Sequence, residues 1–236
     1  EIIDTTEEVV ASNRALLGPN EDYWVSQRIS NGVISLDGEP PIQDGATIVI
    51  ECTPLPLRDR ASMFRDGIEA VIAPLPDALS PNAKINNYMN PMLAQREVTA
   101  IRPGAWALQL DMNGNLAEGV GCNVFFVRDG KVITPKADNI LPGVTRAVVL
   151  ELCRDNGIDV TEQDVSLHTA TTASEAFFTS TSLCLCPVRS LNGRSYLGHA
   201  GPVTKRLMGL FTDLVGCDYV AQYLAHLRAG TTRTGF

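Results

Sequence analysis

The chain has 236 residues, 44% of them hydrophobic, and its 19 basic and 27 acidic side chains give a net charge of −8. This length suits one large domain or two small ones with a proper core, and a charged fraction of 19% excludes a disordered chain. The acidic balance argues against nucleic acid as the main partner.

The first part of the chain reads as a helix followed by strands. Capping-box spacing from Thr5 to Glu8 predicts a helix over Thr6–Leu17. Runs of β-branched and apolar residues predict strands at Tyr23–Ser30, Ala46–Thr53 and Ile68–Ala73. Prolines punctuate the stretch from Pro54 to Pro81, which predicts a linker or a domain crossover there.

The second part mixes hairpins with isolated helices. Asn113-Gly114 and Asp129-Gly130 are typical of tight β-hairpin turns. Helices are predicted over Tyr88–Ile101, Val144–Asn156 and Pro202 to about Leu227, and strands at Ala105–Asp111, Leu116-Ala117, Val124–Val127, Val132-Ile133, Glu175–Ser180 and Leu185–Leu191. This mixture predicts an α+β fold with largely antiparallel sheets, in a smaller domain of residues 1–81 and a larger one of residues 82–236.

Targeting signals and cysteine chemistry are not apparent. The first thirty residues are acidic, no apolar run reaches the roughly 18 residues of a membrane span, and the six cysteines include no C-x-x-C pair. We expect reduced, structural thiols rather than a metal site, in a soluble, cytoplasmic protein without a membrane partner.

Lysine is scarce, since only four occur in the chain. Lys84 stands between Ala83 and Ile85, where the proline-rich stretch enters a new block of structure. A half-buried amine at such a place suits Schiff-base chemistry, because burial lowers its proton affinity. The alternative is a solvated loop lysine.

Three other segments carry candidate chemistry. In Glu118–Asn123, two glycines beside a carboxylate let the backbone approach a flat ligand, unless the glutamate merely ends a hairpin. Leu141–Arg146 places Gly143 before a predicted helix, whose first amides form an anion cradle or only an ordinary N-terminus. The four hydroxyls of Thr179–Ser182 could bind phosphate or carboxylate oxygens, or merely close a turn.

Together these segments resemble the class IV pyridoxal-phosphate aminotransferases, which include branched-chain, D-amino-acid and (R)-amine transaminases. The resemblance covers the chain from about Lys84 to Phe211. It rests on five motifs in the order and spacing of that family: Lys84–Tyr88, Glu118–Asn123, Leu141–Arg146, Phe178–Thr181 and Gly201–Thr204.

The resemblance implies the two-domain fold type IV, with a small α/β domain and a larger barrel-like domain with mainly antiparallel strands, in a homodimer. It implies that Lys84 is the catalytic residue and binds the aldehyde of pyridoxal 5′-phosphate as a Schiff base. Glu118 would pair with the pyridinium nitrogen. Other cofactor-binding residues implied are Gly121, Leu141, Gly143, Val144, Thr145 and Thr181, and substrate-binding candidates are Thr179, Ser180, Ser182, Tyr88 and Arg28.

Members of this family carry strands ahead of the helix predicted at Thr6–Leu17, and those strands supply an arginine for the cofactor phosphate. We therefore expect either a longer natural chain or an abridged small domain. Arg28 is a candidate for the substrate carboxylate, with a surface arginine as the alternative, and the spacing from Lys84 to Tyr88 differs by one residue from the branched-chain type.

These observations predict a transaminase of amino-acid metabolism. It would move an amino group between a branched-chain or D-amino acid, or a primary amine, and a 2-oxo acid. Two alternatives stay open: a lyase resembling aminodeoxychorismate lyase, and a catalytically silent relative of the same fold.

Overall fold

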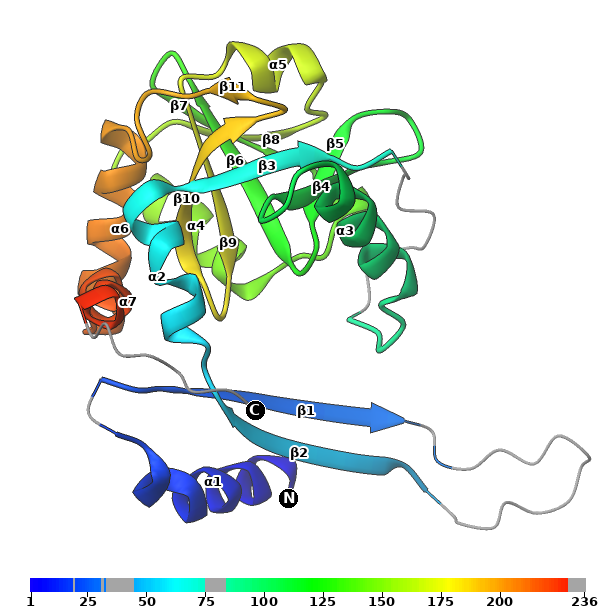
Figure 1. Ribbon diagram of the computed structural model, residues 1–236, viewed down its shortest axis with the longest axis vertical. Helices are drawn as coiled ribbons and strands as arrows, with labels where there is room; N and C mark the ends of the chain where they lie inside the picture. The colour runs from blue at the N-terminus through cyan, green and yellow to red at the C-terminus, as the bar shows by residue number, and fades with distance from the viewer. Residues whose placement is uncertain (19, 31, 33–44, 75–83, 229–236) are drawn as a thin grey trace, which may run out of the picture. The chain divides into compact units, whose positions relative to one another are not determined.

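The computed structural model describes residues 1–18, 20–30, 32, 45–74 and 84–228. They form two compact units, which divide between Leu57 and Arg58 (Figure 1). The expected domain boundary at Pro81 lies outside the described residues, so the division into residues 1–81 and 82–236 stays a prediction.

The first unit consists of a helix and a β-hairpin. Helix α1 (Ile2–Asn13) continues into the short 3₁₀ helix η1 (Arg14–Leu16), and strands β1 (Tyr23–Ser30) and β2 (Thr47–Pro54) pair antiparallel. The expected capping box is wrong, because α1 begins earlier: the Thr5 hydroxyl donates to the carbonyl of Glu1 inside the helix.

The proline-punctuated stretch is not a linker in its first part. Residues Leu57–Asp66 form helix α2, and Ile68–Ile72 form strand β3. Leu57, Ala61 and Phe64 are buried at the spacing of one helix face. This amphipathic pattern overrides the turn signals of the flanking prolines.

The second unit is built on a nine-stranded sheet that closes on itself. Its strands are β3, β4 (Trp106–Leu110), β5 (Leu116–Gly119), β6 (Cys122–Arg128), β7 (Lys131–Pro135), β8 (Val160–Gln163), β9 (Glu175–Ser180), β10 (Cys184–Leu191) and β11 (Arg194–Ser195). Strand β9 pairs with both β6 and β10, so β10, β3, β4, β5, β6 and β9 form a closed ring. The β3–β4, β3–β10 and β7–β8 pairs are parallel and the others antiparallel, which confirms the expected barrel-like α+β architecture.

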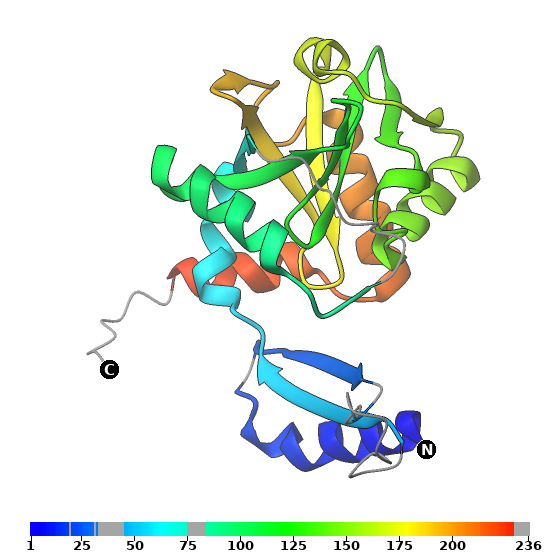
Figure 2. The same cartoon turned by 90° about the vertical axis from the view of Figure 1, so that its right-hand side faces the viewer.

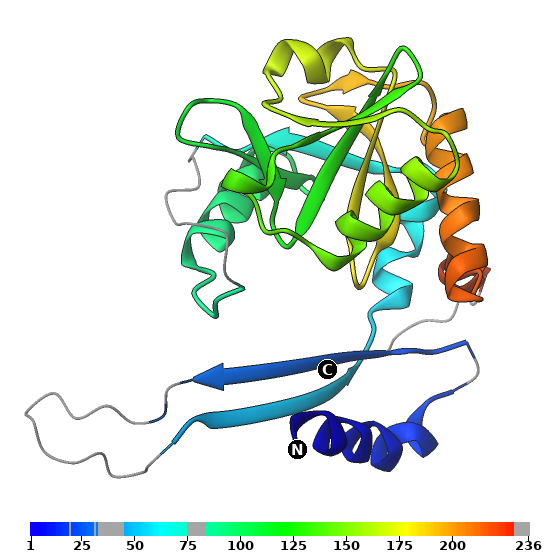
Figure 3. The same cartoon turned by 180° about the vertical axis from the view of Figure 1, so that it is seen from behind.

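The helices of this unit are α3 (Met89–Ile101), η2 (Ala137–Asn139), α4 (Val144–Asp155), α5 (Leu167–Thr172), α6 (Pro202–Val215) and α7 (Tyr219–Arg228). Figure 1 and Figure 2 show α3 and α6 at different sides of the barrel. Helix α4 packs against α6 and β9, as the view from behind in Figure 3 also shows.

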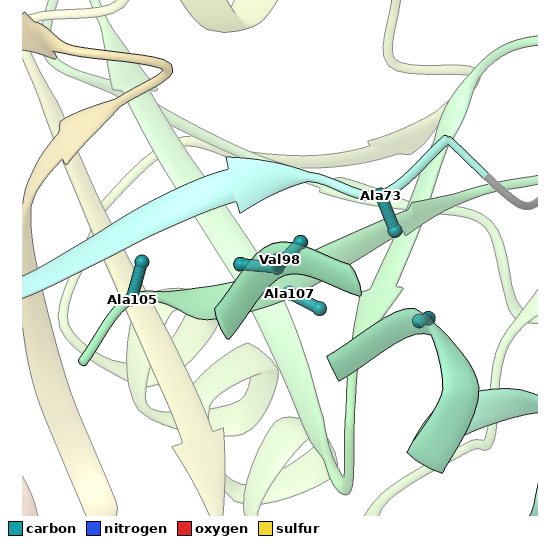
Figure 4. Close-up of a cluster of buried hydrophobic side chains, with 5 residues drawn as sticks. Ala73, Val98, Ala105 and Ala107 are labelled. Carbon is teal, nitrogen blue, oxygen red and sulfur yellow. The ribbon is translucent and has the colours of Figure 1, made fainter. Parts of the chain in front are cut away.

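Small side chains let α3 lie close to the barrel. Val98 of α3 is buried with Ala73, Ala105 and Ala107 in one cluster (Figure 4). Helix α3 therefore packs against β4, and the Lys84–Tyr88 segment directly precedes this helix.

Two features differ from expectation in this unit. The helix predicted from Pro202 to about Leu227 is broken after Val215, because Gly216 adopts a left-handed conformation (φ 66°) that ends α6. Strands β8 and β11 and helix α5 were not anticipated, since they are short and lack a clear apolar period. Within the described residues, every helix is too short or too polar to cross a membrane.

Candidate functional site

A cavity of about 380 Å³ in the second unit is lined by residues of four of the five motifs, and Gly201–Thr204 does not line it. The residues expected from the sequence that line it are Lys84, Tyr88, Glu118, Gly121, Leu141, Gly143, Val144, Thr145, Thr179, Ser180 and Thr181. A volume of this size suits a small organic molecule rather than an ion or a macromolecule.

The carboxylate of Glu118 lies on the cavity wall and is fixed by two neighbours. The backbone amide of Leu141 donates to it at 3.1–3.2 Å, and the side-chain amide of Asn123 donates at 3.0 Å. Asn123 also donates to the Leu141 carbonyl at 2.8 Å. The β5–β6 hairpin and the loop before α4 therefore hold one acceptor aimed at a ligand.

The N-terminus of α4 faces the same cavity. Gly143 stands at its N-cap position and has no side chain with which to cap the helix. A Cβ atom on Gly143 would come within 2.3 Å of Oδ1 of Asn123, so only glycine permits this approach of the loop to β6. The first amides of α4, at Val144 and Thr145, remain available to an anion, which the helix dipole favours.

Lys84 and Tyr88 line the cavity from the start of α3. Nζ of Lys84 donates to the hydroxyl of Tyr88 at 3.1 Å, and Tyr88 is the N-cap residue of α3. Both residues are exposed within the described part of the chain, so the expected half-buried amine at Lys84 is wrong, although its Nζ is accessible to a small molecule that enters the cavity.

The hydroxyl groups of Thr179–Ser182, at the turn between β9 and β10, have different surroundings: some hold the turn, and others lie on the cavity wall. Oγ1 of Thr179 is buried on the cavity wall without a hydrogen-bond partner among the described residues. Oγ of Ser180 accepts from the amide of Leu183 and so closes the turn. Oγ of Ser182 accepts from Arg60 at 2.9 Å, and Ser182 is not among the residues that line the cavity.

Two arginines from the sequence analysis, Arg28 and Arg146, form ion pairs with glutamates. Arg28 lies on β1 of the first unit and pairs with Glu51 at 2.6 Å. Arg146 is buried, and it binds Glu162 at 2.6 Å and the carbonyl of Pro135 at 2.8 Å. Arg146 therefore anchors α4 to β7 and β8, while the roles proposed for Arg28 and Ser182 stay predictions.

Cys122 lines the cavity but is not a nucleophile at neutral pH. Burial, with a smaller contribution from the charge of Glu118, raises the pKa of its thiol well above the ordinary value. The thiol therefore stays protonated, and burial likewise raises the pKa of Cys186 on β10.

Sequence reasoning missed two polar residues of the wall. Asn123 was part of a motif but had no assigned role, although its spacing from Glu118 pairs the two across the β5–β6 hairpin. Gln109 lies on β4 and is 1% exposed. In the sequence, the one indication of a role for Gln109 was that a polar residue interrupts an apolar strand.

Comparison with known proteins gives a consistent result. The model of the amino-transferase class IV family matches residues 19–191. The branched-chain-amino-acid aminotransferase of Escherichia coli K12 is 31% identical over 224 residues, which are 90% of this chain and 70% of that protein.

Solved structures resemble the chain over most of its length. A crystal structure of the E. coli branched-chain amino acid aminotransferase has a TM-score of 0.77 at 29% identity, and covers 90% of this chain and 70% of its own. The branched-chain amino acid aminotransferase from Thermobaculum terrenum in its PLP-bound form has a TM-score of 0.69 at 26% identity, over 86% of this chain and 67% of its own. A Legionella pneumophila chain assigned as a 4-amino-4-deoxychorismate lyase has a TM-score of 0.72 at 19% identity, over 87% and 73%, and shows the fold alone.

Proposed function

From the premise that the chain belongs to the class IV aminotransferases, which are pyridoxal-phosphate enzymes, we propose that the cavity is its cofactor and substrate site. The observation that carries this proposal is the convergence on one cavity of an amine, an uncapped helix start and a fixed carboxylate. These three groups match the aldehyde, the phosphate and the ring nitrogen of pyridoxal phosphate.

The unpartnered hydroxyl of Thr179 supports the same assignment. A buried polar atom without a partner costs roughly 1–3 kcal/mol, and a ligand in the cavity that bonds to this hydroxyl would remove that cost. Thr179 lies beside Asn123 in the β6–β9 register, on the face that carries Glu118. The residues present therefore fit the cofactor.

In this proposal each group of the chain has one task. The carboxylate of Glu118 holds a proton on the ring nitrogen, and the Asn123 amide keeps that carboxylate in place. The amides of Val144 and Thr145, with the hydroxyl of Thr181, bind the phosphate, while Leu141 and Gly121 line the ring.

The amine of Lys84 has the catalytic task. With the cofactor bound, Nζ would take the proton from the substrate carbon that carries the amino group, and in the second half of the exchange it would deliver a proton to the corresponding carbon of the 2-oxo acid. The hydroxyl of Tyr88 orients this amine by accepting its hydrogen bond. The bound cofactor supplies the aldehyde that carries the amino group and the ring that accepts electrons.

We propose branched-chain amino acids as amino donors and a 2-oxo acid as acceptor. The support is the identity to enzymes named for that substrate class. D-amino acids and primary amines are the competing donors. The proposed substrate contacts are Thr179, Ser180, Ser182, Tyr88 and Arg28.

We also propose that the chain acts as a homodimer. Light scattering of the purified protein tests this.

The test is a spectrum of the purified protein before and after addition of L-leucine, D-alanine or a primary amine. A transaminase loses its visible cofactor band and gains the band of the amino form, and borohydride fixes the cofactor on Lys84. Lys84→Arg should abolish both effects, whereas Lys205→Arg, on the exposed side of α6, should change neither.

The outcome also separates the alternatives. A lyase would bind the cofactor but would not yield the amino form with any donor. A silent relative would show neither the visible band nor the adduct on Lys84, and this result would refute the proposal.

A further inference from the structure

Four neighbouring strands carry one row of polar side chains on a single face of the sheet. Glu118 pairs with Asn123 across β5 and β6, and Asn123 pairs with Thr179 across β6 and β9. On the other side β4 pairs with β5 through Leu108 and Gly119, and the register shifts by one residue at Gln109. Gln109 and Glu118 both line the cavity, which puts the two side chains on its wall together. All four side chains of the row line the cavity.

The two middle members of this row are hydrogen-bonded to each other, but the two ends carry unpartnered atoms. Nε2 of Gln109 and Oγ1 of Thr179 are buried without a hydrogen-bond partner among the described residues. Each of these two residues is only 1% exposed. Burial of an amide nitrogen without an acceptor is costly, and a ligand in the cavity that Gln109 lines would supply one.

The positions of the substituents on the pyridoxal ring indicate which cofactor oxygen would lie near Gln109. In pyridoxal phosphate the phosphate arm and the phenolic oxygen lie on opposite flanks of the axis from the ring nitrogen to the aldehyde carbon. The start of α4 lies on the flank of β6 and β9, because Leu141 contacts Asn123 and α4 packs on β9. With the nitrogen at Glu118, the phenolic oxygen therefore faces β4 and Gln109.

We propose that the side-chain amide of Gln109 donates a hydrogen bond to the phenolic oxygen of the bound pyridoxal ring. This inference rests on the proposed function. It makes Gln109 a cofactor-binding residue that stabilises negative charge on that oxygen, opposite the phosphate anchor. A hydrogen bond to a charged oxygen is among the stronger ones in proteins.

The test is a spectrophotometric pH titration of the holoenzyme. A donor at the phenolic oxygen lowers the pKa of the proton that this oxygen shares with Nζ of Lys84. Gln109→Leu should therefore raise the midpoint of the visible band by about one pH unit. Gln163→Leu, the same change on β8 outside the cavity, is the matched control and should leave the midpoint unchanged.

Thermal unfolding distinguishes this contact from a structural role. Because Nε2 of Gln109 has no protein partner among the described residues, the Gln109→Leu apoprotein should melt no lower than the wild-type apoprotein. Its gain in melting temperature on binding pyridoxal phosphate should be smaller than that of the wild type. If the leucine variant does not fold, Gln109→Glu should also raise the midpoint, because a carboxylate repels the charged oxygen.

An unchanged midpoint in the variant would overturn the proposal. So would an effect confined to the KM of the amino donor, which would place Gln109 against the substrate instead. Failure of the proposed function is a different result, since the wild-type protein itself would then show no visible band and no adduct on Lys84.

Discussion

At the scale of single residues, the cavity depends on one carboxylate held by two amides. Glu118 receives bonds from Leu141 and Asn123, and because both donors are neutral amides, neither bond neutralises its charge. The protonated ring nitrogen of the cofactor would add a charged donor to this acceptor.

The change Glu118→Gln keeps the shape of this side chain and removes its charge. We expect kcat to fall by roughly 10- to 100-fold, because the charge-assisted bond that keeps the ring nitrogen protonated is worth about 1.5–3 kcal/mol. Steady-state kinetics at saturating cofactor measures this loss. Activity equal to wild type would show that Glu118 does not face the ring nitrogen.

The change Asn123→Leu removes both bonds that this side chain makes, to Glu118 and to the Leu141 carbonyl. We expect the free energy of unfolding to fall by about 2–3 kcal/mol, since two acceptors lose their donor. Urea unfolding of the apoprotein measures it. Asn123→Asp should destabilise more strongly although it preserves size, because it sets a second carboxylate against Glu118; a neutral effect of both variants would contradict the network.

At the scale of elements, the start of helix α4 places backbone amides at the cavity wall. Helices α4 and α6 both begin after a glycine at the N-cap position, which has no side chain to cap the helix. At the start of α6 the buried Glu175 accepts from the amides of Val203 and Thr204 instead. The α6 terminus is therefore satisfied from within the protein, and at the α4 terminus, which lines the cavity, we propose that the cofactor phosphate takes the corresponding place.

Gly143→Ala tests how the α4 terminus is placed. The backbone of Gly143 suits any residue (φ −66°), so the effect comes from the clash with Asn123 alone. We expect at least a tenfold weaker affinity for pyridoxal phosphate, measured by fluorescence titration, because the first amides of α4 shift away from the phosphate. Gly209→Ala, inside α6 with open space around it, should instead leave affinity unchanged and stabilise the fold by about 0.5–1 kcal/mol.

At the scale of the whole molecule, buried titratable groups limit stability at high pH. Burial raises the pKa of Cys153 to about 11 and that of Tyr223 to about 12. Each group binds its proton more tightly when folded than when unfolded, so its contribution is complete below the ordinary pKa and is lost as pH rises above it.

We therefore expect the melting temperature to decline from about pH 9 towards pH 11, which is the window set by Cys153. Calorimetry across this range measures the slope. Cys153→Ala should flatten the decline relative to wild type, while Cys217→Ala, at an exposed thiol, should not. A flat profile in the wild type would contradict the assignment.

Local signals in the sequence determined most elements of the second unit. The glycine turns at Asn113-Gly114 and Asp129-Gly130 set hairpins, and Asp129 and Gly130 both adopt positive φ. The apolar run at Glu175–Ser180 became a strand with those bounds, as did Tyr23–Ser30 in the first unit. Such signals depend on neighbouring residues alone, and five short motifs in order were sufficient to indicate the family.

Only the tertiary structure decided which polar residues share the cavity. Closure of the barrel by β9 brings Thr179 beside Asn123, and the pairing of β4 with β5 brings Gln109 to the cavity that Glu118 lines. Ser182, one residue from Thr181, is instead held by Arg60 of α2. Strand pairing and side-chain partners distant in sequence set these outcomes, because the direction of a side chain depends on register and packing that no local pattern encodes.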